Sequence, residues 1–72
     1  SQGYKMTKDG IVGFYTCEYS NMTGFTSLHF VYNGRYYCKH AYVFLRGFAI
    51  DKRIHEFVRE VKIMASEKED EG

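Results

Sequence analysis

The pattern of apolar and polar positions divides the chain into five segments. Four of them are rich in β-branched and aromatic residues, which favour strands: residues 4–8, 11–20, 25–32 and 35–45. The fifth segment follows Gly47 and changes to the three- and four-residue spacing that is typical of an amphipathic helix. The pattern predicts an α+β fold, in which a four-stranded antiparallel β-meander is followed by one C-terminal helix packed on one sheet face, in the order ββββα.

Short glycine-containing stretches mark the predicted turns. Asp9-Gly10 and Asn33-Gly34 suit two-residue hairpin loops, because the central residues of such loops take positive φ. Residues 21–24, Asn-Met-Thr-Gly, supply the middle connection, and Gly47 is expected to make the turn from the last strand into the helix.

The predicted registers assign each strand residue to one of two sheet faces. The Asn33-Gly34 turn sets Phe30 opposite Tyr37, and a four-residue middle loop sets Tyr15 opposite Phe30. The face expected to carry the helix comprises Tyr4, Met6, Tyr15, Cys17, Tyr19, Leu28, Phe30, Tyr37, Ala41 and Val43. The opposite face is mixed and comprises Lys5, Thr7, Phe14, Thr16, Glu18, Ser27, His29, Val31, Tyr36, Cys38, His40 and Tyr42. A shift of the middle register by one residue would bury Glu18, which disfavours that alternative.

The helix has a predicted start and a predicted buried stripe. The Asp51 carboxylate can accept hydrogen bonds from free amides at the first turn, so Asp51 is the expected N-cap. Phe57 and Val61 are expected to be the central buried residues. The full stripe is Ile54, Phe57, Val58, Val61 and Met64.

Length and charge refine this organisation. A chain of 72 residues holds one small domain, which we expect over residues 4–65. The side chains of residues 66–72 have a net charge of −3, because four acidic residues accompany Lys68. Residues 1–65 therefore have a net charge of +4, and the whole chain has +1. We expect 66–72 to form a disordered acidic tail. No apolar run approaches the roughly 20 residues of a membrane-spanning helix.

The cysteines suggest the compartment. In the predicted sheet, Cys17 and Cys38 lie about two strand spacings apart, which exceeds the reach of a disulfide. Free thiols are typical of reducing compartments, so the expected location is the cytoplasm.

Two kinds of chemistry could use the mixed face. His29, Cys38 and His40 offer nitrogen and sulfur ligands that zinc prefers, but a structural zinc site usually takes four ligands. A predicted cross-strand row of Glu18, Ser27 and His40 resembles acid–base groupings, yet no oxyanion donors or glycine-rich loop accompany it. The sequence therefore predicts a noncatalytic protein without a metal or a cofactor.

A binding function fits the mixed face better. Exposed aromatic and histidine rings can stack on bases while nearby cations meet phosphates, so the first predicted partner is single-stranded nucleic acid. The predicted binding residues are Lys5, Phe14, His29, Arg35, Tyr36, His40 and Tyr42. The alternative is a protein-interaction module, such as an inhibitor, adaptor or subunit, that uses this face or a sheet edge. A homodimer is expected in either case, because so many aromatic residues are unfavourable in water.

Overall fold

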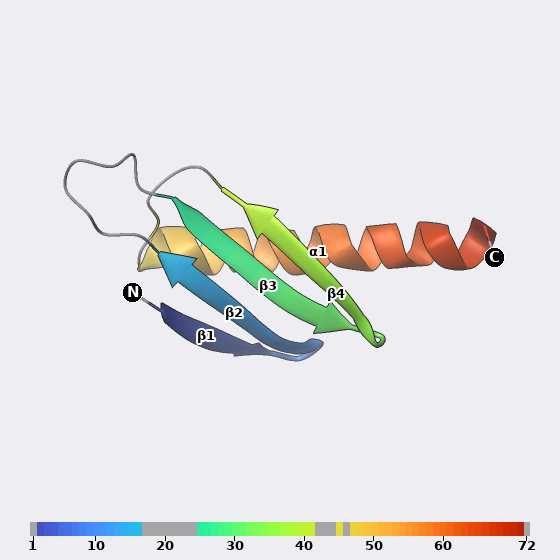
Figure 1. Cartoon of the computed structure of the whole chain (residues 1–72), viewed down its shortest axis with the longest axis horizontal. Helices are drawn as coiled ribbons and strands as arrows, with labels where there is room; N and C mark the ends of the chain where they lie inside the picture. Colours follow the sequence, from blue (N-terminus) through green and yellow to red (C-terminus); the bar gives the residue numbers. More distant parts are fainter. Residues whose placement is uncertain (1, 17–24, 42–44, 46, 72) are drawn as a thin grey trace.

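The structure is a computed structural model that describes residues 2–16, 25–41, 45 and 47–71, and it confirms the ββββα order (Figure 1). One antiparallel sheet contains, in chain order, β1 (Gln2–Thr7), β2 (Gly10–Thr16), β3 (Thr26–Tyr32) and β4 (Arg35–His40). The helix α1 (Phe48–Glu71) lies across one face of this sheet, in contact with β3, and its C-terminal part extends past the strands.

Within the described ranges, no helix combines the length and the apolar character that crossing a membrane requires. The helix continues to Glu71, through most of the acidic segment. The domain boundary at residue 65 and the disorder of residues 66–72 stay predictions.

The β3–β4 hairpin has the predicted register. Asn33 and Gly34 take positive φ values of 51° and 75°, which is the conformation that a type I′ turn requires. Phe30 therefore pairs with Tyr37, and His29 pairs with Cys38. A tight turn with a defined geometry leaves only one register for the strands that it joins.

The β1–β2 hairpin turns one residue earlier than predicted, which shifts the pairing of β1 with β2 by two residues. Its loop residues are Lys8 and Asp9, and Thr7 pairs with Gly10. The Thr7 hydroxyl closes the turn, because it donates to the Gly10 carbonyl at 2.6 Å and accepts from the Asp9 N–H at 3.2 Å. A shift of two residues leaves side chains of β1 on the same face as their predicted neighbours in β2.

The predicted β2–β3 register is wrong. Phe30 pairs with Val12, and Tyr15 pairs with Ser27, so β2 lies three residues away from its expected position. Because side chains alternate along a strand, an odd shift exchanges the two faces of β2, and β1 follows it. Tyr4, Met6 and Tyr15 are consequently exposed on the face opposite α1. The predicted face positions of Cys17, Glu18, Tyr19, Tyr42 and Val43 lie outside the described residues.

The core explains why the observed register is favoured. Val12 is fully buried beside Leu28 and Phe30, and Phe14 packs against the same cluster. The predicted register would instead have turned the Tyr15 hydroxyl toward the helix, where burial without a partner costs free energy. The correct arrangement places two apolar side chains of β2 in the core.

The helix begins earlier than predicted, so Asp51 lies in its first turn and is not the N-cap. Gly47 has a φ of 58° directly before Phe48, which confirms its role in the turn into the helix. Phe57 and Val61 are buried as predicted, whereas Met64 is 41% exposed. The buried helix residues are Ile50, Ile54, Phe57, Val58 and Val61.

Candidate binding surface

The sheet face opposite α1, called here the outer face, is built from three cross-strand rows. Its residues are set by the strand registers. The first row contains Met6, Ile11, Val31 and Tyr36; the second contains Tyr4, Gly13, His29 and Cys38; the third contains Gln2, Tyr15, Ser27 and His40.

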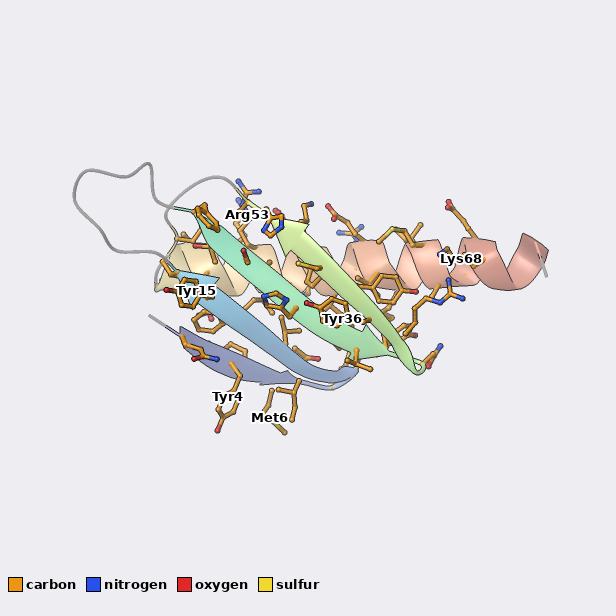
Figure 2. All side chains as sticks on the ribbon, viewed as in Figure 1. Tyr4, Met6, Tyr15, Tyr36, Arg53 and Lys68 are labelled. Carbon is orange, nitrogen blue, oxygen red and sulfur yellow. The ribbon has the colours of Figure 1, made fainter. Side chains whose placement is uncertain are left out.

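Large apolar and aromatic side chains stand out from this face. Tyr4, Met6 and Val31 are each more than 60% exposed, and Ile11, Tyr15 and Tyr36 are also exposed. Figure 2 shows Tyr15 and Tyr36 in front of the sheet, and Tyr4 and Met6 at its β1 edge. Clusters of exposed apolar side chains on a small monomer are often interaction sites.

Ionised side chains are missing from the described rows of the outer face, which contain no Lys, Arg, Asp or Glu. The basic residues of the described strands have the opposite parity. Lys5, for example, reaches toward the helix, where its Nζ lies 3.0 Å from an Asp51 carboxylate oxygen. The outer face is therefore apolar and aromatic, with histidine, serine, glutamine and cysteine as its polar members.

A small polar cluster occupies the β4 side of this face. The His29 ring lies beside the Tyr36 ring, with centroids 5.9 Å apart, and the Tyr36 hydroxyl hydrogen bonds to His29 Nδ1. Partial desolvation raises the pKa of the Tyr36 phenol above its ordinary value of 10.0. The neighbouring Cys38 side chain raises this pKa further, through a side-chain hydrogen bond and an electrostatic interaction. Tyr36 therefore stays neutral at physiological pH and its hydroxyl remains a hydrogen-bond donor.

The second histidine is held at the other end of β4. His40 Nδ1 lies 2.8 Å from the buried Ser27 hydroxyl, as expected for a directly opposed pair. The Phe25 ring contacts the His40 ring edge-on, with centroids 6.3 Å apart. These contacts fix the orientation of His40 on the surface.

The structure brings together some of the predicted binding residues and separates others. His29, Tyr36 and His40 share the outer face as predicted. Phe14 and Lys5 lie on the helix side, because they follow the exchanged faces of β2 and β1. Arg35 borders a small surface pocket together with Ala65 and Lys68 of α1, and Tyr42 lies outside the described residues.

The sequence analysis missed four residues of the outer face: Tyr4, Met6, Ile11 and Tyr15. Their signal was present as alternation along the first two strands, but both parities of β2 carry apolar residues. A register error of three residues was enough to assign Tyr4, Met6 and Tyr15 to the wrong side, and Ile11 was assigned to neither face.

Metal binding has little support at this surface. His29 lies opposite Cys38 as predicted, but the described residues contain no group of three or more His, Cys, Asp and Glu side chains placed to hold a metal ion. Cys38 is an exposed free thiol.

Neither a protein-family model, nor a curated protein, nor a solved structure matches the chain. The physical properties of its surfaces must therefore carry the functional argument.

Proposed function

We infer that the protein is a noncatalytic interaction module whose outer face pairs with the outer face of a second copy. The observation that carries this proposal is the combination of exposed apolar and aromatic side chains with a lack of charged ones among the described rows. The cores of protein interfaces are depleted in charge and enriched in tyrosine and methionine, and this face has both properties.

A second copy is a suitable partner because two such uncharged faces can approach each other without electrostatic repulsion. Across a two-fold axis each patch meets an identical patch, so any ionised side chain near the axis would approach its own copy. A face of neutral side chains avoids that repulsion. Two sheets can pack face to face about 10 Å apart, with their side chains interdigitating.

The size of the sheet limits the strength of this pairing. Four strands of six or seven residues cover a footprint of about 19 Å by 20 Å, from the usual strand spacing and rise. This footprint is small compared with the roughly 800 Å² that each partner buries in a standard interface. We therefore expect a weak dimer whose population depends on protein concentration.

Single-stranded nucleic acid is the second candidate partner, supported by the Tyr15, Tyr36 and His29 rings that could stack on bases. Such binding also needs cations close to the phosphates. Lys5 is paired with Asp51 on the other side of the sheet, so this candidate would depend on Lys8 and Arg35 at the ends of the strands. The protein candidate requires no further groups.

The test of dimerisation is the molar mass from light scattering, measured as the concentration rises into the high micromolar range. Wild-type protein should approach the dimer mass, and Val31→Lys should remain monomeric because it places a charge in the first row of the outer face. Ile63→Lys is the matched control, since Ile63 is also exposed but lies on α1. A wild-type monomer throughout the range would overturn the proposal, provided that melting curves show all three proteins folded.

The same proteins distinguish the nucleic-acid candidate. We expect no binding of a dye-labelled single-stranded oligonucleotide at low salt, measured by fluorescence anisotropy. Tight binding that weakens steeply with salt, by a protein that stays monomeric, would favour nucleic acid instead. A cytoplasmic location also remains part of the proposal, because the exposed Cys38 thiol suits a reducing compartment.

A further inference from the structure

A groove on the other side of the sheet separates the β1–β2 hairpin from α1. A four-stranded sheet is about 19 Å wide, whereas one helix with its side chains is about 10 Å across. Since α1 packs on β3, it leaves the β1 side of the sheet partly uncovered. The resulting hairpin groove has a volume of about 560 Å³, with residues 5–9 on one bank and the helix between Asp51 and Lys62 on the other.

The two banks are joined by an ion pair near each end. Lys5 of β1 pairs with Asp51 near the start of α1, at 3.0 Å. Lys62 approaches Asp9 of the hairpin turn, at 3.5 Å. These half-exposed pairs each contribute at most about 1 kcal/mol to stability, but they define the separation of the banks.

Between these ion pairs the groove has an apolar floor and an excess of positive charge. Ile54 and Val58 are buried side chains that line it. Lys8 and Arg59 also line it, and neither has an ion-pair partner within the described residues. The four cationic side chains of the groove exceed its two carboxylates by two, so its field attracts anions.

The strand bank adds a third recognition element. β1 is an edge strand of the described sheet, so the backbone groups along its outer side face no neighbour among the four described strands. Peptides bind such edges by adding one more strand, which takes affinity from backbone hydrogen bonds and selectivity from alternate side chains. A chain paired with β1 would direct alternate side chains toward the groove.

We propose that the hairpin groove binds an acidic peptide segment of a partner protein, extended along the edge of β1. An apolar side chain of the peptide contacts Ile54 and Val58, and its carboxylates pair with Lys8 and Arg59. The described lining of the groove contains no Phe, Tyr or Trp ring, and His55 is its one described ring. A single imidazole is a poor platform for successive bases, which disfavours single-stranded nucleic acid.

This proposal is independent of the outer face, because the groove lies on the helix side of the sheet. A dimer formed through the outer faces would leave one groove open on each copy. Two grooves in one particle would bind a bivalent or repeated acidic partner with increased avidity. A monomer would still bind a single peptide.

The probe is a dye-labelled synthetic peptide that repeats Glu-Glu-Leu-Leu, so that each side of the extended chain carries both Glu and Leu. It is titrated with the full chain at low salt and followed by fluorescence anisotropy. Lys8→Gln and Arg59→Gln should each weaken binding about tenfold, which corresponds to about 1.4 kcal/mol. Lys68→Gln is the matched control, since Lys68 lies on the part of α1 beyond the sheet and does not line the groove (Figure 2). It should bind like the wild type.

Two matched peptides test the chemistry. Replacing every Glu of the peptide by Gln should abolish binding, because the peptide then has no carboxylate to pair with Lys8 and Arg59. Methylating alternate backbone nitrogens, on the side that would face β1, should weaken binding if the peptide adds as a strand. Unchanged affinity after Lys8→Gln and Arg59→Gln would overturn the proposal, as would a single-stranded oligonucleotide that binds these two residues more tightly than the peptide. Val31→Lys, which blocks outer-face pairing, should leave peptide binding intact and so separates the two proposals.

Discussion

Thr16 and Thr26 face each other at the buried end of the β2–β3 pair, with their hydroxyl oxygens 3.3 Å apart. The Thr26 hydroxyl also accepts a hydrogen bond from the Leu45 N–H at 3.1 Å. This pair therefore connects the ends of the two central strands to Leu45, in the segment that leads into α1. It also satisfies polar groups that would otherwise be buried without partners.

Thr26→Val tests this connection. Valine has nearly the shape of threonine but cannot accept the Leu45 N–H, so a buried donor loses its partner. We expect a loss of about 1–3 kcal/mol in the free energy of unfolding, measured from urea denaturation midpoints. Thr26→Ser keeps the hydroxyl and serves as the control. If Val is tolerated as well as Ser, the hydrogen bond contributes nothing to stability.

The parity of β2 can be tested with two neighbouring aromatic residues. Phe14 packs against the core, whereas Tyr15 is 47% exposed on the outer face. Phe14→Ala should therefore cost about 3 kcal/mol or more, while Tyr15→Ala should cost less than half as much. Thermal melts of the two variants decide between the registers. The opposite ranking would restore the register that the four-residue middle loop implied.

Gly3 offers a test of the contact between β1 and β2. A Cβ at Gly3 would lie 2.6 Å from the tip of the Phe14 ring, so Gly3→Ala forces the ring or the strand to move. We expect a loss of about 1–3 kcal/mol, the usual cost of overpacking. The double variant Gly3→Ala with Phe14→Leu should recover part of it, which a double-mutant cycle measures. Additive costs would show that the ring is not the obstacle.

The raised pKa of the Tyr36 phenol should make the stability of the fold depend on pH. Its pKa is raised in the folded state, with desolvation as the first cause, so folding favours the neutral form. The contribution is complete below the ordinary value of 10.0 and is lost as the pH rises through the raised pKa. As the pH is raised above 10, the free energy of unfolding should therefore fall less for Tyr36→Phe than for the wild type. Urea denaturation midpoints at a series of pH values measure this difference. Identical profiles would contradict the shift.

The parts of the fold that followed from the sequence are those with local signals. Asn33-Gly34 permits one tight turn, so the cross-strand neighbours of β3 and β4 could be predicted residue by residue. The period of the helix identified Phe57 and Val61 as buried. In both cases a few adjacent residues contain the whole signal.

The register between β2 and β3 depends instead on distant residues. Both Val12 with Phe14 and Ile11 with Tyr15 form plausible apolar faces, so the alternation within β2 could not decide which one meets the helix. The decision comes from packing against Leu28 and Phe30, together with the Thr16–Thr26 pair. The face of β1 is set by its pairing with β2. The wrong β2–β3 register therefore put Lys5 and Phe14 on the predicted binding surface, and it put Tyr4 and Met6 on the helix side.

The part of α1 beyond the sheet has a consequence for hydrogen exchange. Val61 is the last buried helix residue among those whose burial the structure describes, yet the helix continues to Glu71. Amide hydrogens between Ile54 and Val61 should exchange only when the whole domain unfolds, because opening this section exposes the core. Protection should then fall turn by turn toward Glu71, since the later turns keep only peripheral contacts with the sheet, such as the Lys62–Asp9 ion pair. We therefore expect the single helix to have two regions, one that unfolds with the sheet and one that frays from its C-terminal end.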